Sequence, residues 1–240
     1  ARIAAIGLGG TVQRSIDLDF HPAVAGPDET ARIIGEASVD LLTGRPTVIG
    51  VGTAVHGMID HEGRLAVGPN LGWQHLDLAA ASHRWQPVSV PTFFGNDATL
   101  GARGEYRRGV GRNRENLFYL SAERGVGGAS ITAGTSQLGH HGFAGEVGHM
   151  VVKRGGRSCT CGSQGCWETE IGETALLRKA GRRANNRAGA AGVIAAAVAG
   201  EAEALAAVAD IAGWLGFGIG NIANLADPEI VICGGYLGVV

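Results

Sequence analysis

The most distinctive chemistry in the sequence is a group of cysteines that follows a histidine. Cys159, Cys161 and Cys166 fall within eight residues, and His149 lies shortly before them. Three thiolates and one imidazole form a closed tetrahedral set of the kind that holds a structural Zn²⁺. Glycines between the cysteines let the chain curve around one ion. The pattern therefore predicts a zinc site held by His149, Cys159, Cys161 and Cys166.

The competing interpretation of these cysteines is that they are free or disulfide-bonded thiols. A disulfide across Cys-x-Cys is strained, and a reducing cell interior disfavours it further. His140 and His141 are alternatives for the fourth ligand, and Cys233 lies in an apolar segment typical of a core. A closed site leaves no open position for water, so the zinc is expected to shape the fold and do no chemistry.

The elements that must position these residues alternate between strands and helices. A hairpin over 3–18, turning at Gly9-Gly10, is favoured over a phosphate loop there. A helix is expected to begin near Pro27, and buried strands over 47–55 and 87–94 are joined by a turn-rich link. Further elements are predicted as a helix over 98–107, strands over 116–121, 129–133 and 229–235, a glycine-rich turn over 125–128, and an alanine-rich helical region over 171–220. This alternation indicates an α/β fold with a mixed sheet.

Composition narrows the function classes. The net charge is −2 and the basic residues are dispersed, which argues against a nucleic-acid-binding face in these 240 residues. We find no apolar run of membrane-spanning length and no signal peptide, so a cytoplasmic protein with no membrane contact is expected.

Several linked motifs carry a family resemblance that covers nearly the whole chain. The segment Gly145-Glu146-Val147-Gly148-His149 precedes the cysteine group, which continues to Glu168. The other motifs are Gly50-Val51-Gly52 through Gly57, Pro69-Asn70-Leu71-Gly72-Trp73, Asn96-Asp97, Gly125-Val126-Gly127 and Gly234-Gly235. In this order they resemble the ROK family of bacterial sugar kinases and sugar-responsive transcriptional repressors.

The resemblance implies an actin-like ATPase (ribonuclease H-like) fold, in which two α/β lobes close over a sugar. Residues 1–97 would form the first lobe, without its first strand and phosphate loop. Residues 98–240 would form the second lobe, with the zinc loop. The chain is expected to be truncated at both ends.

The resemblance also assigns the site residues. It implies that His149 and the three cysteines are zinc ligands. It implies that the residues contacting the sugar are Gly57, Asn96, Asp97, Glu146, His149 and Glu168. One ring nitrogen of His149 would bind zinc while the other faces the sugar. Without the family, Asn96-Asp97 after a strand would be interpreted as a helix N-cap.

Two functions remain open. In the family's kinases the residue matching Asp97 is the general base that activates a sugar hydroxyl for attack on Mg·ATP. Gly125, Gly127, Gly234 and Gly235 would then bind nucleotide. Two departures from those kinases bear on the choice: the first phosphate-binding loop is expected to be absent, and Arg124 stands where a small hydroxyl residue is expected. The chain also has His56-Gly57 where Pro-Gly is common, a difference that the sequence does not explain.

We therefore favour the sugar-sensing domain of a regulator, with an ATP-dependent, glucokinase-like hexose kinase as the alternative. A regulator would bind DNA through an upstream helix-turn-helix that these 240 residues do not contain. The family also implies a homo-oligomer, either a dimer or a tetramer. A degenerate domain that binds neither sugar nor DNA is a third interpretation.

Overall fold

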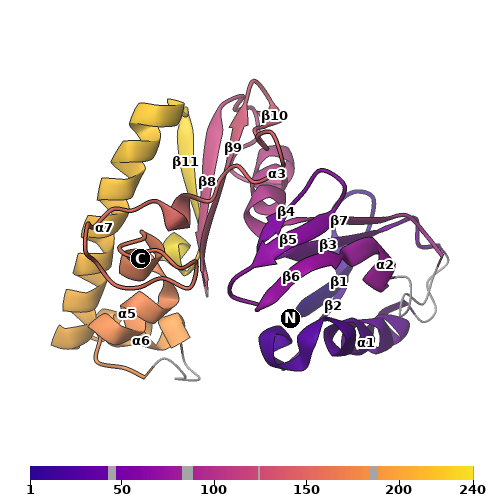
Figure 1. Ribbon diagram of the computed structural model, residues 1–240, viewed down its shortest axis with the longest axis horizontal. Helices are drawn as coiled ribbons and strands as arrows, with labels where there is room; N and C mark the ends of the chain where they lie inside the picture. The colour runs from indigo at the N-terminus through magenta and orange to yellow at the C-terminus, as the bar shows by residue number, and fades with distance from the viewer. Residues whose placement is uncertain (43–46, 83–88, 124, 184–188, 240) are drawn as a thin grey trace. The chain divides into compact units, whose positions relative to one another are not determined.

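The protein divides into two compact units. A computed structural model describes residues 1–42, 47–82, 89–123, 125–183 and 189–239 (Figure 1). Unit 1 comprises Ala1–Asp97 with His141–Phe143, and unit 2 comprises Ala98–His140 with Ala144–Val240.

Unit 1 begins with a hairpin and a long helix. Strands β1 (Arg2–Ile6) and β2 (Val12–Asp17) pair antiparallel with a register shift at Ala5/Ile6, as the sequence predicts. Helix α1 (Pro22–Leu42) is interrupted at Gly26, whose φ is 80°. The predicted start near Pro27 is therefore the start of the second part of α1, because proline suits a first helical position. The turn of helix before Gly26 is an addition to the prediction.

A parallel strand pair forms the second part of unit 1. Strand β3 (Val51–Val55) pairs parallel with β7 (Thr92–Asn96), and Val55 lies opposite Asn96. The predicted strand over 47–55 is too long, because regular pairing begins only at Val51. The predicted strand over 87–94 ends two residues too early, and its first two residues lie outside the described part of the chain. The two strands end side by side, so the residues that follow them are neighbours.

The predicted turn-rich link does turn at residues 69–72, but it also contains a small sheet that the sequence did not predict. Strands β4 (Met58–Ile59), β5 (Arg64–Gly68) and β6 (Trp73–Asp77) pair antiparallel, and helix α2 (Leu78–Ser82) follows. The sheet buries an apolar cluster that also includes β3, with members Val55, Ile59, Leu65, Leu71 and Leu78. This cluster fixes the backbone that leaves β3.

Unit 2 is built on a four-stranded mixed sheet. Its strands are β8 (Leu117–Ala122), β9 (Val126–Thr132), β10 (Thr135–Ser136) and β11 (Ile230–Gly235), in the order β10-β9-β8-β11. Side chains along β8 alternate between faces: Leu117 packs into one apolar cluster, and Phe118 and Leu120 pack into another. Helix α3 (Asp97–Arg108) covers the first face, and helix α7 (Ala202–Ala226) covers the second (Figure 1). The sheet is therefore buried on both sides, as its apolar strands predict.

The alanine-rich region is helical, as predicted, but it forms several helices. They are α4 (Glu168–Ile171), α5 (Glu173–Lys179), α6 (Gly189–Val198) and α7 (Ala202–Ala226), with 3₁₀ turns η1 (Val147–His149) and η2 (Tyr236–Val239) elsewhere in unit 2. Most of the predicted break near 188–189 lies outside the described residues.

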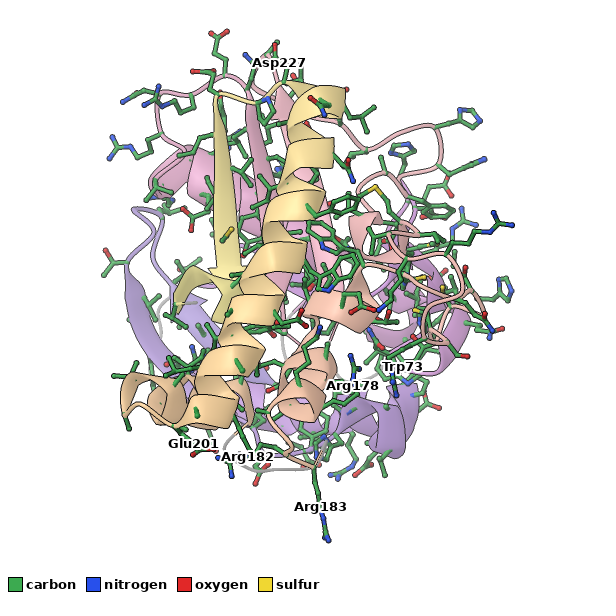
Figure 2. All side chains as sticks on the ribbon, turned by 90° about the vertical axis from the view of Figure 1, so that its left-hand side faces the viewer. Trp73, Arg178, Arg182, Arg183, Glu201 and Asp227 are labelled. Carbon is green, nitrogen blue, oxygen red and sulfur yellow. The ribbon has the colours of Figure 1, made fainter. Side chains whose placement is uncertain are left out.

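Helix α7 contradicts the expectation that no segment is long and apolar enough to cross a membrane. Its 25 residues pass that test by length and composition, although the core helix of a soluble protein also passes it. Figure 2 shows α7 running between Glu201 and Asp227. Ile211 and Ile222 are buried in the core of unit 2, and Gly218 lies against Trp167. This helix is therefore part of the packing of unit 2.

Candidate metal centre and ligand-binding residues

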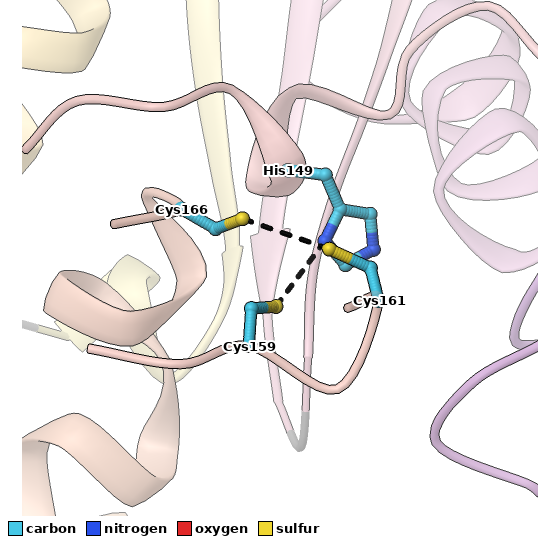
Figure 3. A group of neighbouring side chains, drawn as sticks. All are labelled: His149, Cys159, Cys161 and Cys166. Carbon is cyan, nitrogen blue, oxygen red and sulfur yellow. Dashed lines mark hydrogen bonds between the residues drawn. The ribbon is translucent and has the colours of Figure 1, made fainter. Parts of the chain in front are cut away.

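The four predicted metal ligands lie together in unit 2. His149 ends η1, and the three cysteines follow in a loop that leads to α4. One ligand atom from each of His149, Cys159, Cys161 and Cys166 lies within 4.8 Å of the others. The Cys159 sulfur is 3.6 Å from His149 Nδ1, and the Cys161 and Cys166 sulfurs are 3.7 Å apart (Figure 3). This cluster could hold a metal ion.

Backbone hydrogen bonds and two glycines shape the cysteine loop. Cys159 N–H donates to the Ser163 carbonyl at 2.8 Å, and Gly162 N–H donates to the Cys159 carbonyl at 3.0 Å. Gly162 and Gly165 have φ of 91° and 75°, which side chains rarely adopt. A Cβ at Gly165 would stand 1.8 Å from the Lys153 carbonyl oxygen. The turn therefore requires glycine at Gly165 to bring Cys166 back towards Cys159 and Cys161.

The thiols differ in their electrostatic surroundings. Burial raises the pKa of Cys159, and burial together with the neighbouring thiols raises the pKa of Cys166 to about 12. Burial also acts upward on Cys161, but hydrogen bonds from the Ser163 backbone and the other two thiols outweigh it and lower its pKa. Cys233 lies apart on β11, where burial raises its pKa, and it packs against the core as predicted. Metal binding at the cluster must displace thiol protons, because thiolates are the ligands.

Two acidic residues adjoin the cluster. Glu146 Oε2 lies 3.7 Å from His149 Nε2, so the imidazole has one ring nitrogen towards the cysteines and the other towards a carboxylate. Glu168 Oε1 lies 3.8 Å from the Cys159 sulfur, while its Oε2 accepts a 2.9 Å hydrogen bond from Val126 N–H. The cluster and strand β9 therefore fix the Glu168 carboxylate together. The structure brings three predicted sugar-binding residues, Glu146, His149 and Glu168, to one place in unit 2.

The other three predicted sugar-binding residues lie together in unit 1. Asn96 ends β7 and donates from Nδ2 to the Gly57 carbonyl at 3.1 Å. Asp97 follows it, and its Oδ2 lies 2.7 Å from His56 Nδ1. Gly57 has φ of 138°, and a Cβ there would stand 2.7 Å from the Val67 carbonyl oxygen. These groups stand at the carboxyl ends of two parallel strands, where open α/β sheets bind their ligands.

The four glycines predicted for nucleotide flank the end of β8. Gly127 of β9 and Gly234 of β11 are both register partners of Ser121, one on each side. A Cβ at Gly234 would stand 2.2 Å from the Tyr119 hydroxyl, and Gly235 has φ of 62°. The predicted turn over 125–128 is too long, because β9 already begins at Val126. Arg124, the departure from the kinases, lies outside the described residues.

Sequence reasoning missed the partner of Asp97. His56 stood out in the sequence only as a replacement for proline, and its imidazole contacts the carboxylate that the motif assigns to the sugar. The signal was available in principle, because residues that directly follow paired parallel strands are adjacent. Recognising it required the pairing of β3 with β7.

Comparison with proteins of known sequence gives the family. The ROK family model matches residues 25–240. The chain is 32% identical to the xylose repressor of Bacillus subtilis over 229 residues, which is 94% of this chain and 58% of that protein. It is 33% identical to a glucokinase of Halalkalibacterium halodurans over 204 residues, which is 78% of this chain and 61% of that protein. The chain thus spans about three fifths of the length of these relatives.

Solved structures agree with this result. A Streptomyces griseus ROK glucokinase, solved with glucose and AMPPNP, superposes with a TM-score of 0.82 at 28% identity over 97% of this chain and 78% of that chain. A ROK transcriptional regulator homologous to the Escherichia coli MLC protein gives a TM-score of 0.80 at 22% identity over 98% and 62%, which bears on the fold alone. The fold is the mixed α/β, actin-like ATPase fold of sugar kinases. The chain belongs to the ROK family.

Proposed function

We propose that this chain is the sugar-sensing domain of a ROK-family transcriptional regulator. The observation that carries the proposal is the departure from kinases in Glu123-Arg124-Gly125, because a bulky cation replaces the small hydroxyl residue expected to face phosphate groups. The alignment with the Bacillus subtilis xylose repressor over 94% of this chain supports the same choice. In this proposal, DNA binding belongs to a helix-turn-helix upstream of Ala1, and the protein acts in the cytoplasm as a homo-oligomer.

The residues proposed to contact the sugar are mostly polar: Gly57, Asn96 and Asp97 belong to unit 1, and Glu146, His149 and Glu168 belong to unit 2. Asn96, Asp97, Glu146 and Glu168 supply amide and carboxylate groups, and each carboxylate can accept hydrogen bonds from adjacent hydroxyls of a monosaccharide. His149 contributes the ring nitrogen that faces Glu146, at 3.7 Å from that carboxylate. Gly57 contributes backbone where a side chain does not fit. A polyol requires this combination of donors and acceptors.

The metal in the proposal is a structural zinc ion. Zinc–sulfur and zinc–nitrogen bonds in a tetrahedron place two sulfurs about 3.8 Å apart, and a sulfur and a nitrogen about 3.6 Å apart. The distances here are 3.7 Å between Cys161 and Cys166 and 3.6 Å between Cys159 and His149. Zinc held by four protein ligands would fix His149 and, through the Cys159 loop, Glu168. Metal analysis of freshly purified protein should find one zinc per chain, and none in Cys161→Ser.

The second candidate function is an ATP-dependent sugar kinase. The glucokinase relatives and the superposition on the Streptomyces griseus enzyme favour it. Asp97 would then accept the proton of the attacking sugar hydroxyl. Gly125, Gly127, Gly234 and Gly235 would approach the phosphates of Mg·ATP, because the end of β8 brings these segments together.

One experiment separates the two functions. Zinc-loaded protein is titrated with D-xylose and D-glucose by calorimetry, and the same samples are then incubated with Mg·ATP and analysed for ADP and sugar phosphate. The sensor proposal predicts saturable binding of a sugar without ATP, and no more sugar phosphate than an Asp97→Asn control forms. Turnover at about ten per second, a typical enzyme rate, would refute the sensor and establish the kinase. Folded, zinc-loaded protein that binds no monosaccharide would refute both.

A further inference from the structure

The turn after β3 contacts both polar residues that end β7. Val55 pairs with Asn96 in parallel register, so His56 and Asp97 are the residues that directly follow the two adjacent strands. His56 Nδ1 lies 2.7 Å from Asp97 Oδ2, and the Gly57 carbonyl accepts Asn96 Nδ2 at 3.1 Å. Each residue of the His56-Gly57 turn thus contacts one polar residue of the Asn96-Asp97 pair.

The His56 backbone is held firmly. His56 follows the last paired residue of β3, and the next residue, Gly57, is packed so closely that a Cβ would stand 2.7 Å from the Val67 carbonyl oxygen. The adjoining Val55 side chain is part of the buried cluster of unit 1. A constrained backbone on this side fixes the point from which the His56 side chain reaches Asp97.

The ion pair contributes little to folding. The side chains of His56 and Asp97 are 46% and 31% exposed, and water screens the attraction within such partly exposed pairs. The pair matters chiefly for the orientation of Asp97, because a short charge-assisted hydrogen bond restricts how the carboxylate can turn. With Oδ2 held by the imidazole, the position of Oδ1 follows.

We propose that His56 is a positioning residue for the sugar ligand. Its Nδ1–H donates to Asp97 Oδ2 and holds the carboxylate in the orientation that receives a sugar hydroxyl. The inference rests on the proposed function, since it requires that Asp97 contacts the sugar. The proline that is common at this position in the family has no side-chain donor, so the contact depends on the histidine of this chain.

The test compares variants that keep or remove this donor. His56→Ala removes it, whereas in His56→Asn the side-chain amide can occupy the place of Nδ1. His61→Ala is the matched control, because His61 is an exposed histidine of the same unit, in the turn between β4 and β5. Each protein is titrated with D-xylose and D-glucose by calorimetry after its fold is checked by circular dichroism.

The inference predicts that His56→Ala weakens the sugar Kd about tenfold, as expected for the loss of one charge-assisted hydrogen bond. His56→Asn and His61→Ala should remain within about twofold of the unchanged chain, a difference of about 0.4 kcal/mol. In an Asp97→Ala background, His56→Ala should have no further effect, because the two residues act as one unit. A merely structural histidine would weaken binding in both backgrounds and would not be replaced by asparagine.

The outcomes distinguish this inference from the proposed function. Unchanged or tighter binding in His56→Ala, or equal losses in His56→Ala and His56→Asn, overturns the inference and leaves the sugar site intact. If the unchanged chain binds neither sugar, the proposed function is overturned and the positioning role with it. The ¹⁵N signals of the His56 ring provide a separate check: they should shift in Asp97→Ala whether or not sugar is added.

Discussion

Gly148 lies beside His149, where the candidate metal centre meets strand β9, and adding one methyl group there should destabilise unit 2. A Cβ on Gly148 would stand 2.1 Å from the carbonyl oxygen of Val126 and 3.0 Å from its carbonyl carbon. Ordinary contact begins at 3.4 Å, so the backbones must separate by about 1.3 Å. Both backbone segments are constrained. Val126 is paired in β9 and donates its N–H to Glu168, and Gly148 is followed by His149, whose ring contacts the Cys159 sulfur.

The cost of Gly148→Ala follows from these constraints. Overpacking at sites that cannot relax costs about 1–3 kcal/mol, and two backbone segments in contact place this variant near 3 kcal/mol. With a urea m-value of about 2 kcal/mol per M, the unfolding midpoint should fall by about 1.5 M. Gly104→Ala is the control, because this exposed position in α3 has no atom within 4 Å of the added Cβ. It should be neutral or stabilising by about 0.5–1 kcal/mol.

Urea titration followed by tryptophan fluorescence measures this effect, because Trp167 is fully buried in unit 2. Metal content after gel filtration gives a second readout, and Gly148→Ala should retain less zinc than the unchanged chain. A midpoint within about 0.3 M of the unchanged chain, where the expected shift is about 1.5 M, would refute the claimed contact between the His149 turn and β9.

Three further predictions concern separate parts of the chain. Cys161→Ser should release the metal and lower the thermal midpoint of unit 2, whereas Cys233→Ser should keep the metal; metal analysis and calorimetry of both variants check this. Gly57→Ala should weaken sugar binding by at least about tenfold, because the added Cβ would displace the turn that contacts Asn96; a sugar Kd unchanged in calorimetry would contradict it. Glu229 has its pKa lowered chiefly by accepting the backbone N–H of Asn116, with smaller help from Glu115 N–H. A lowered folded pKa adds stability above the unfolded pKa, which is lost as pH falls through the folded value. Glu229→Gln should therefore flatten the decline in stability below about pH 4.5; an unaltered pH profile in urea unfolding would contradict the assignment.

The sequence predicted that His149 and the three cysteines lie together, because the information for this grouping is local. Cys159, Cys161 and Cys166 are near in sequence. Gly162 and Gly165 indicate tight turns between them, and both adopt the positive φ that such turns require. Two strands of the sheet in unit 2 could also be predicted from the sequence, since β8 and β11 are largely continuous apolar runs. These runs located both strands to within one residue.

Other features depended on pairing between distant segments. Strand β4 has two residues, and β5 and β6 stand between turns, so their periodicity is too short to distinguish from a loop. The contact of His56 with Asp97 arises from the parallel register of β3 and β7, which no local pattern contains. Helix α7 shows the opposite problem, because its composition satisfies a membrane-span criterion although its buried face packs against the sheet.

The most direct test of this account is the sugar affinity of one preparation in three states: zinc-loaded, stripped by a chelator, and reloaded with zinc. The account holds that four ligands fix His149 and Glu168, so calorimetric binding of the sugar should be lost on stripping and restored on reloading. Stripped protein that remains folded and binds the sugar with unchanged affinity would contradict it.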